Sequence, residues 1–504
     1  MSGVATAVES LRLRQRLRAR LRSERVYRDI LGERSEYQPW ANWQRTPLEW
    51  REHPLIEKYA RPDQPPIQWQ AHLSQARFKT MAGCPRGGKS LWAAGEVLPD
   101  LRVPGWLTVF LGPTYKEALK EFYYALDFLS RRFGAHVWSG IRQNHQHGGP
   151  GGFIYWKYNG RRVRHEVRAA SADRPGSISA DDWNTLVLCE GPDIPANLWE
   201  QRIVSRIERV QGRVIAAYSP QGGDWMQKEF EARSASGDPD YAHFNITAFD
   251  NPAFNPSIAE KAKGKRSEPS WRHTFLGARV HYEGLVYGTW GTDGKQGWDD
   301  DHNIIPWTPN PALETCVSID PGIGTASVGW WQIFQRGGVE CAVRFDERVQ
   351  QSWDTTAIRE YIRRHPSFRY LRYMVIDPYK GEQRQSAEGR TDERVLADLG
   401  IPIKKPPRVY RGQSAIKARV EIVRSLICAF DGTRRLYVSP VCARWLHDRG
   451  NYRYPDTGAD LDKPLKDNAS DHTMDETSYL AAVRLPVVYV PSTTQSRTHD
   501  PLGV

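Results

Sequence analysis

The stretch Gly83-Cys-Pro-Arg-Gly-Gly-Lys-Ser90 decides the fold of the first half of the chain. It matches the phosphate-binding pattern G-x-x-x-x-G-K-[ST] at every position. The apolar segment 77–82 before it predicts a strand, and segment 90–97 after it predicts a helix, which is the context that such a loop requires. A chance glycine-rich turn is the alternative, and the flanking segments favour a P-loop.

Each residue type in this loop has a role in binding a nucleotide. Gly83, Gly87 and Gly88 let backbone N–H groups close around phosphates, and the helix N-terminus adds favourable partial charge. Lys89 is expected to reach the β- and γ-phosphates, and the Ser90 hydroxyl to ligate Mg²⁺. The sequence therefore predicts a site for ATP with Mg²⁺, in which Lys89 also acts in catalysis.

Two later apolar runs complete this predicted site. Thr185-Leu-Val-Leu-Cys-Glu190 ends in a carboxylate, and Glu190 is expected to polarise the attacking water. Cys189 stands where an Asp is usual, and a thiol is a poor Mg²⁺ ligand, so we expect a small buried apolar residue there. Metal coordination would then rest on Ser90, water and the nucleotide. Ser219, at the end of a third strand, is a candidate sensor of the γ-phosphate.

The bulk properties suit a DNA-binding protein of two or three domains. The chain has 504 residues and a formal net charge of +11, which fits a polyanionic partner without requiring one. Apolar runs alternate with helical stretches from about 67 to 250, which favours a mainly parallel sheet. No CxxC pair, signal-type segment or membrane-length apolar run occurs, so we expect an intracellular protein with no membrane partner.

The N-terminal segment is rich in arginine. Eight arginines fall between Arg12 and Arg28, with leucines interleaved at helical spacing. A helical arm that grips DNA or a partner and a solvated charged helix are equally compatible with this pattern.

Carboxylates recur at strand ends in the second half of the chain. Asp320 follows an apolar run before a glycine turn, and Asp377 holds the same position on a later strand. His472 and Asp475 begin a predicted helix at i, i+3 spacing, with Asp471 as a further metal ligand or only a helix N-cap. Each signal alone is weak, but together they follow the order of an RNase H-like nuclease. Such a group could hold two Mg²⁺ or Mn²⁺ ions that activate water for phosphodiester cleavage.

Taken in order, these motifs resemble the large subunit of tailed-phage terminases over residues 60–485. In the first half the resemblance rests on Gln68-Trp-Gln70, CPRGGKS, LVLCE, AYSPQGG and FDNPAFNPS, and in the second half on the three carboxylate motifs. It implies that Gln68, or next to it Gln70, contacts adenine, and that Arg86 is the arginine that these motors carry in the P-loop. Cys189 departs from the family's Asp-Glu pair.

The resemblance also implies an architecture and an activity. We expect an α/β protein in which a P-loop NTPase domain with a parallel-rich sheet precedes an RNase H-like nuclease domain. The expected segments are a basic arm and lead-in (1–60), the ATPase domain (61–250), a bridge with a Lys/Arg-rich helix at 259–273 (251–310), the nuclease domain (311–485) and an extended tail (486–504).

Such a protein would drive double-stranded DNA into a procapsid and cut concatemers. Its implied partners are double-stranded DNA, the portal protein, a small terminase subunit and further copies of itself in a homopentamer. It would work in the host cell cytoplasm, docked on the portal for a time. Two alternatives stay open: a helicase-like DNA-dependent ATPase with a regulatory or inactive nuclease domain, and a nucleotide-binding structural protein of the capsid vertex.

Overall fold

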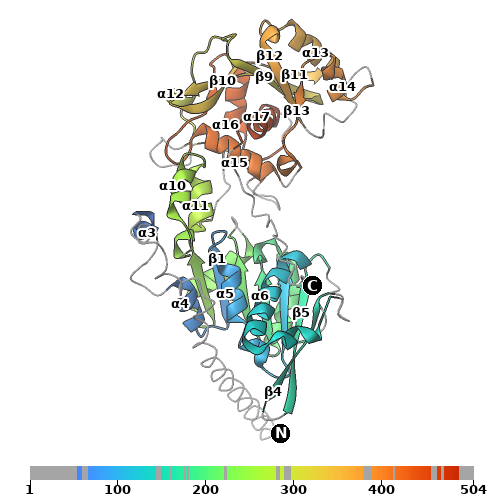
Figure 1. Cartoon of the computed structure of the whole chain (residues 1–504). Helices are drawn as coiled ribbons and strands as arrows, with labels where there is room; N and C mark the ends of the chain where they lie inside the picture. The colour runs from blue at the N-terminus through green and yellow to red at the C-terminus, as the bar shows by residue number, and fades with distance from the viewer. Residues whose placement is uncertain are drawn as a thin grey trace. The chain divides into compact units, whose positions relative to one another are not determined.

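The computed structural model divides into two compact units, which we describe separately (Figure 1). Unit 1 comprises residues up to Pro256 together with His273–Arg279, and unit 2 comprises Ser257–Arg272 and the residues from Val280 onward. The structure describes residues 54–59, 66–143, 149–158, 161–174, 178, 181–220, 224–251, 253–279, 284–288, 297–377, 379, 389–412, 415–455, 463–466 and 470–486. The predicted basic arm and C-terminal tail lie outside these residues, apart from 54–59 and the single residue 486.

Unit 1 is built on an eight-stranded sheet in the order β3-β4-β5-β2-β6-β7-β1-β8. Its strands are β1 (Phe78–Gly83), β2 (Leu107–Gly112), β3 (Ile141–Arg142), β4 (Gly151–Tyr158), β5 (Arg161–Ser171), β6 (Thr185–Cys189), β7 (Arg213–Tyr218) and β8 (Tyr241–Ile246). The six strands from β5 to β8 in this order pair in parallel, and β3 and β4 add an antiparallel edge. Strand β7 lies between β1 and β6, so the ends of these three strands meet at one edge of the sheet.

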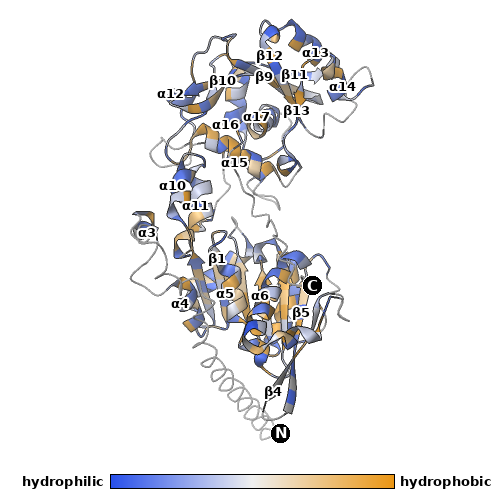
Figure 2. Ribbon diagram, viewed as in Figure 1, coloured by the Kyte–Doolittle hydropathy of each residue, from blue (hydrophilic) through white to orange (hydrophobic). Residues whose placement is uncertain are grey.

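Helices cover both faces of this sheet, which is why its central strands are apolar along their whole length. Every residue of β1, β2 and β6 is buried. Helices α5 and α6 pack on one face, and α6 shows an apolar and a polar side in Figure 2. The helices of unit 1 are α3 (Pro54–Tyr59), α4 (Ile67–Leu73), α5 (Lys89–Glu96), α6 (Tyr115–Phe133), α7 (Ala196–Leu198), α8 (Val204–Glu208) and α9 (Ala232–Ala235).

Unit 2 contains a six-stranded sheet in the order β13-β12-β9-β10-β11-β14. The strands are β9 (Glu314–Asp320), β10 (Gly322–Arg336), β11 (Val339–Trp353), β12 (Leu371–Ile376), β13 (Ile403–Lys404) and β14 (Leu436–Val438). Strands β9, β10 and β11 form an antiparallel meander, and β12 pairs in parallel with both β9 and β13. The sheet is therefore mixed, with an antiparallel part and a parallel part.

The last helix, α17 (Asp471–Arg484), packs on the face of this sheet formed by β9, β10 and β12. It lies between α15 (Ile416–Ile427) and α16 (Ala443–Asn451) and is almost completely buried. Further helices of unit 2 are α12 (Asp300–Asn303), α13 (Thr355–Arg364) and α14 (Asp392–Ala397). Among the helices that the structure describes, none combines the length and the apolar character needed to cross a membrane.

The segment 259–273, for which the sequence predicted one helix, forms parts of two. Helix α10 (Pro256–Lys263) ends before Gly264, and α11 (Glu268–Leu276) begins after Ser267. The Ser267 hydroxyl accepts a hydrogen bond from the backbone N–H of Ser270 at 3.4 Å, which caps the new helix. A capping serine after a glycine therefore interrupts the predicted helix.

Candidate functional sites

The P-loop connects β1 to α5 through a backbone that only a few residue types tolerate. Gly83 has φ +148°, and a Cβ there would collide with the carbonyl oxygen of Ile246 on the neighbouring strand β8. Gly88 has φ +99°, and Arg86 takes a left-handed φ of 65° without being glycine. Helix α5 begins at Lys89, so its N-terminus points into the loop, as a phosphate site requires.

Lys89 is buried and contacts the loop itself. Its Nζ donates to the carbonyl oxygens of Gly83 at 2.9 Å and Cys84 at 2.7 Å, and lies 3.5 Å from the Ser219 Oγ. Burial lowers the pKa of the Lys89 ammonium, and the negative charge of Glu190 opposes that shift. An anion beside Lys89 would favour the charged form in the same way.

Glu190 and Ser219 also meet at this edge of the sheet. Glu190 follows β6 in a left-handed conformation with φ 51°, and its Oε2 accepts a hydrogen bond from the backbone N–H of Ser219 at 3.0 Å. Because β7 lies between β1 and β6, Ser219 lies between Lys89 and Glu190. The three candidates, which the sequence placed after three separate strands, are therefore brought together.

Gln68 lies against the P-loop from helix α4. Its Nε2 donates to the carbonyl oxygen of Gly87 at 3.3 Å, while its Oε1 is buried with no hydrogen-bond partner in the described part of the chain. An ion pair of 2.5 Å between His72 and Glu96 fastens α4 to α5. The Arg86 side chain is exposed.

Cys189 is fully buried, as the sequence predicted for a small apolar residue. Burial raises the pKa of its thiol well above the usual range, so it stays a neutral thiol. Sequence analysis missed its neighbour Glu121. This buried residue of α6 lies close to Ser90 and Cys189. The sequence does contain a signal for this residue. Glu121 is an acid on the apolar side of a helix, next to Ala118, Phe122 and Ala125.

The second candidate site lies at the carboxyl ends of β9 and β12, two parallel neighbours in unit 2. Asp320 ends β9, and Asp377 follows β12. His472 of α17 lies with its Nδ1 2.7 Å from the Asp320 Oδ2, and the Tyr479 hydroxyl donates to Asp377 at 2.6 Å. The helix thus meets both strand ends, as the sequence predicted for these residues.

Lys466 is a cation at this site that sequence analysis did not identify. It forms an ion pair with Asp475 and lies 3.6 Å from the Asp471 Oδ2. Burial raises the pKa of Asp475, and the charge of Asp320 raises it further, whereas Lys466 opposes the shift. The carboxylates therefore repel one another, and a cation between them relieves that repulsion.

Asp471 corrects one interpretation of the sequence. Ser470 precedes α17, so Asp471 lies in the first helical turn and is not the N-cap. Its Oδ1 is buried with no hydrogen-bond partner within the described residues.

A divalent ion is chemically compatible with this set of donors. Within the residues that the structure describes, no group of three His, Cys, Asp or Glu side chains is arranged to hold a metal ion. Carboxylate oxygens with one imidazole nevertheless suit Mg²⁺ or Mn²⁺, and the unsatisfied Asp471 oxygen leaves coordinating capacity. An ion would have to displace Lys466 from Asp475.

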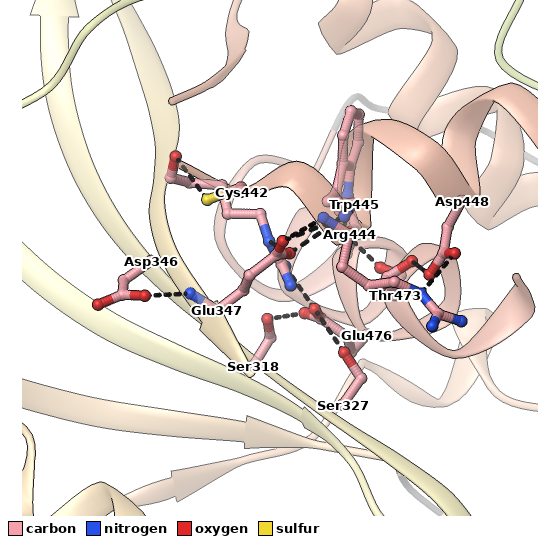
Figure 3. Close-up of polar contacts among 12 residues, drawn as sticks. Ser318, Ser327, Asp346, Glu347, Cys442, Arg444, Trp445, Asp448, Thr473 and Glu476 are labelled. Atoms are coloured by element: carbon pink, nitrogen blue, oxygen red, sulfur yellow. Dashed lines mark hydrogen bonds and ion pairs between the residues drawn. The ribbon is translucent and has the colours of Figure 1, made fainter. Parts of the chain in front are cut away.

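A buried polar network sets the register of α17 on the sheet. Glu476 follows Asp475 and accepts hydrogen bonds from Ser318 of β9 and Ser327 of β10, as Figure 3 shows. It also forms an ion pair with Arg344 of β11. Ser318 lies two residues before Asp320, so the network fixes both sides of the site.

The network continues from Arg344 to the neighbouring helix α16. Glu347 pairs with Arg344 at 3.1 Å and accepts a hydrogen bond of 2.7 Å from the Arg444 backbone N–H. Trp445 and Asp448 of α16 in turn bond Thr477 and Thr473 of α17. The two helices are thereby tied together.

Comparison with solved structures finds the large terminase of a thermophilic bacteriophage. One crystal form of that protein aligns with a TM-score of 0.52 and 15% identity, covering 83% of this chain and 98% of that chain. Its ADP complex aligns with a TM-score of 0.50 and 15% identity over 83% and 98% of the two chains. Its ATP-γ-S complex aligns with a TM-score of 0.50 and 14% identity over 89% and 99%.

No known family profile and no curated protein matches the sequence. The structural similarity therefore carries the comparison, and at this identity it establishes the fold. It covers nearly the full length of the thermophilic phage protein and includes both halves of this chain. The chain has the α/β fold of a phage large terminase, as its motifs predicted.

Proposed function

We propose that this protein is the large subunit of a phage terminase, a motor that hydrolyses ATP to move double-stranded DNA into a procapsid and cuts concatemeric DNA. The observation that carries the proposal is the presence of two candidate sites in one chain. Lys89, Ser219 and Glu190 meet in unit 1, and Asp320, His472 and Asp475 gather in unit 2. The portal protein, a small terminase subunit and further copies of this chain are the partners that this function would require.

In the ATPase site, the backbone N–H groups of the P-loop would bind the phosphates, and Lys89 would move from the loop carbonyls to the transferring phosphoryl group. Glu190 would orient the attacking water and accept its proton. Gln68 would contact the base with its unsatisfied Oε1. Mg²⁺ bound with the nucleotide would neutralise phosphate charge. Ser219, bonded to Glu190 through its backbone, would transmit the state of the γ-phosphate.

In the nuclease site, Asp320, Asp377 and Asp475 would hold the divalent ions with His472 as a supporting ligand and Asp471 as a further one. The ions would supply an activated water and stabilise the leaving oxygen. Tyr479 would fix the orientation of Asp377 through their hydrogen bond of 2.6 Å. Lys466 would neutralise the carboxylates before an ion binds.

Two variants of the full-length protein separate the two activities. Lys89→Ala should lower DNA-stimulated ATP turnover by orders of magnitude, because it removes a charge from the transition state, while DNA cleavage persists. Asp377→Ala should abolish cleavage of plasmid DNA in Mn²⁺ and leave ATP turnover intact. Asp398→Ala, an exposed aspartate of unit 2, is the control and should change neither rate. Full cleavage by Asp377→Ala would contradict the assignment of the nuclease site.

A second candidate is a DNA-dependent ATPase whose nuclease domain is inactive. The observation that favours it is the ion pair of Lys466 with Asp475, which occupies a carboxylate needed for metal. DNA-stimulated ATP turnover by the wild-type protein, without cleavage in either Mg²⁺ or Mn²⁺, would support this candidate. DNA cleavage by the wild-type protein that persists in Lys466→Ala would argue against this second candidate.

A further inference from the structure

The ATPase site lacks one carboxylate at the end of β6. Cys189 is the last residue of that strand and is fully buried, with its Sγ 3.8 Å from the carbonyl oxygen of Val187. Mg²⁺ prefers hard oxygen ligands and binds a neutral thiol poorly. Any second protein oxygen beside Ser90 would therefore come from another element.

Glu121 provides such an oxygen from α6. This helix packs against both α5, which carries Ser90, and β6, which carries Cys189. The Glu121 side chain is only 4% exposed, although it carries a carboxyl group. Buried acids are rare unless a partner compensates the loss of water, so this position calls for a compensating group.

Glu121 lies close to the P-loop helix and to the end of β6. Its neighbours include Ser90, Cys189 and the cation Lys120. Its Oε2 is buried with no hydrogen-bond partner among the described residues. The carboxyl group thus lies near the predicted Mg²⁺ ligand and retains a buried oxygen that is available to an ion.

We propose that Glu121 supplies the protein carboxylate for the divalent ion at Ser90, in place of the aspartate that Cys189 replaces. The ion would bind between the Ser90 hydroxyl and the unsatisfied oxygen of Glu121. This inference rests on the proposed ATPase function and extends it to a residue outside the recognised motifs.

The test measures metal binding rather than turnover. Mn²⁺ affinity of the full-length protein is measured by electron paramagnetic resonance in saturating ADP, and ADP affinity is measured separately in EDTA. Glu121→Gln should weaken Mn²⁺ binding about tenfold or more, the scale seen when a supporting group of a metal site is lost. ADP affinity in EDTA should not change, which also reports a folded site. Asp127→Asn, an exposed residue of the same helix, is the control and should bind Mn²⁺ as the wild type does.

A double variant that moves the carboxylate to another position gives a second test. Glu121→Gln combined with Cys189→Asp should recover Mn²⁺ affinity, because it places a carboxylate at the end of β6. Cys189→Ser alone should retain it. Wild-type affinity in Glu121→Gln, or a loss confined to Cys189→Ser, would overturn the proposal while the ATPase function stands. Failure of the wild-type protein to bind ADP at all would overturn both.

Discussion

Two fully buried glutamates, one in each unit, are held in opposite ways. Glu96, at the end of the P-loop helix, pairs with Lys79 at 2.9 Å, with His72 at 2.5 Å and with Arg213. Burial raises its pKa, but these three partners outweigh burial and hold the pKa well below its usual range. Glu96 is therefore ionised in the folded protein.

Glu476, on the helix of the candidate site in unit 2, has only one cationic partner among the described residues. Burial raises its pKa to about 7, although Arg344 and the Ser318 hydroxyl oppose that shift. Arg344 is shared with Glu347, so less of its charge is available to Glu476. The number of cations, and not burial alone, decides whether a buried carboxyl group keeps its charge.

The two clusters also join different parts of the chain. Glu96 fastens α4 and two strands to α5, which carries Lys89 and Ser90. Glu476 fastens three strands to α17, which carries His472 and Asp475. Each candidate site is thus supported by a buried glutamate. Glu96 is held mainly by ion pairs, whereas Glu476 is held largely by hydrogen bonds.

Replacing Glu96 should have the largest effect. Glu96→Gln removes the negative charge that faces Lys79 and Arg213, and breaking a buried pair in this way costs roughly 3–5 kcal/mol. Calorimetry of the full-length protein should show a lower melting temperature for the transition that ADP raises, which identifies unit 1. Glu208→Gln, which breaks a partly exposed pair with Arg77, is the control and should change little. If the melting temperature falls no more than in this control, Lys79 and Arg213 do not depend on the charge of Glu96.

Replacing Glu476 should cost less. Glu476→Gln keeps the side-chain volume and an acceptor for Ser318, and Arg344 keeps Glu347, so we expect a loss of about 1–3 kcal/mol. The transition that is insensitive to ADP should move, and the ADP-sensitive one should not. A loss equal to that of Glu96→Gln would break the distinction between the two clusters.

The pH dependence gives the smallest effect and a direct readout of charge. Because the folded pKa of Glu96 lies below its ordinary value of 4.5, its stabilising contribution is full above that value and is lost as pH falls. Wild-type unit 1 should therefore lose stability more steeply with falling pH than Glu96→Gln, by at most about 1.4 kcal/mol per pH unit. Melting temperatures between about pH 5 and pH 3 measure this difference. Parallel slopes in that range would mean that folding does not lower the pKa of Glu96.

The residues with local motifs could be predicted from the sequence. The P-loop, Glu190 and the strand-end acids Asp320 and Asp377 each follow an apolar run, and parallel strands bring such ends to one edge. The fold class followed from the same runs. The order of these motifs along the chain was sufficient to predict both candidate sites, because the candidate residues lie at the ends of strands.

The residues that act from elsewhere could not be predicted. Glu121 lies in the middle of α6, and Lys466 lies in a loop, and neither belongs to a local motif. Their roles depend on which element packs against which, and a single sequence does not reveal that pairing. Gly329 is a further case, since a Cβ there would collide with Arg344, yet the sequence shows only a glycine in a strand.

The left-handed backbone of Glu190 has a consequence for protein engineering. A residue with a side chain loses roughly 1–2 kcal/mol in this conformation, which glycine adopts freely. With φ at 51°, position 190 is therefore one where a screen for heat resistance alone would favour glycine. That variant would carry no carboxylate beside Ser219, so the protein would be more heat-resistant but would lack the proposed ATPase activity. Directed evolution of this protein for stability should therefore select on turnover in the same round.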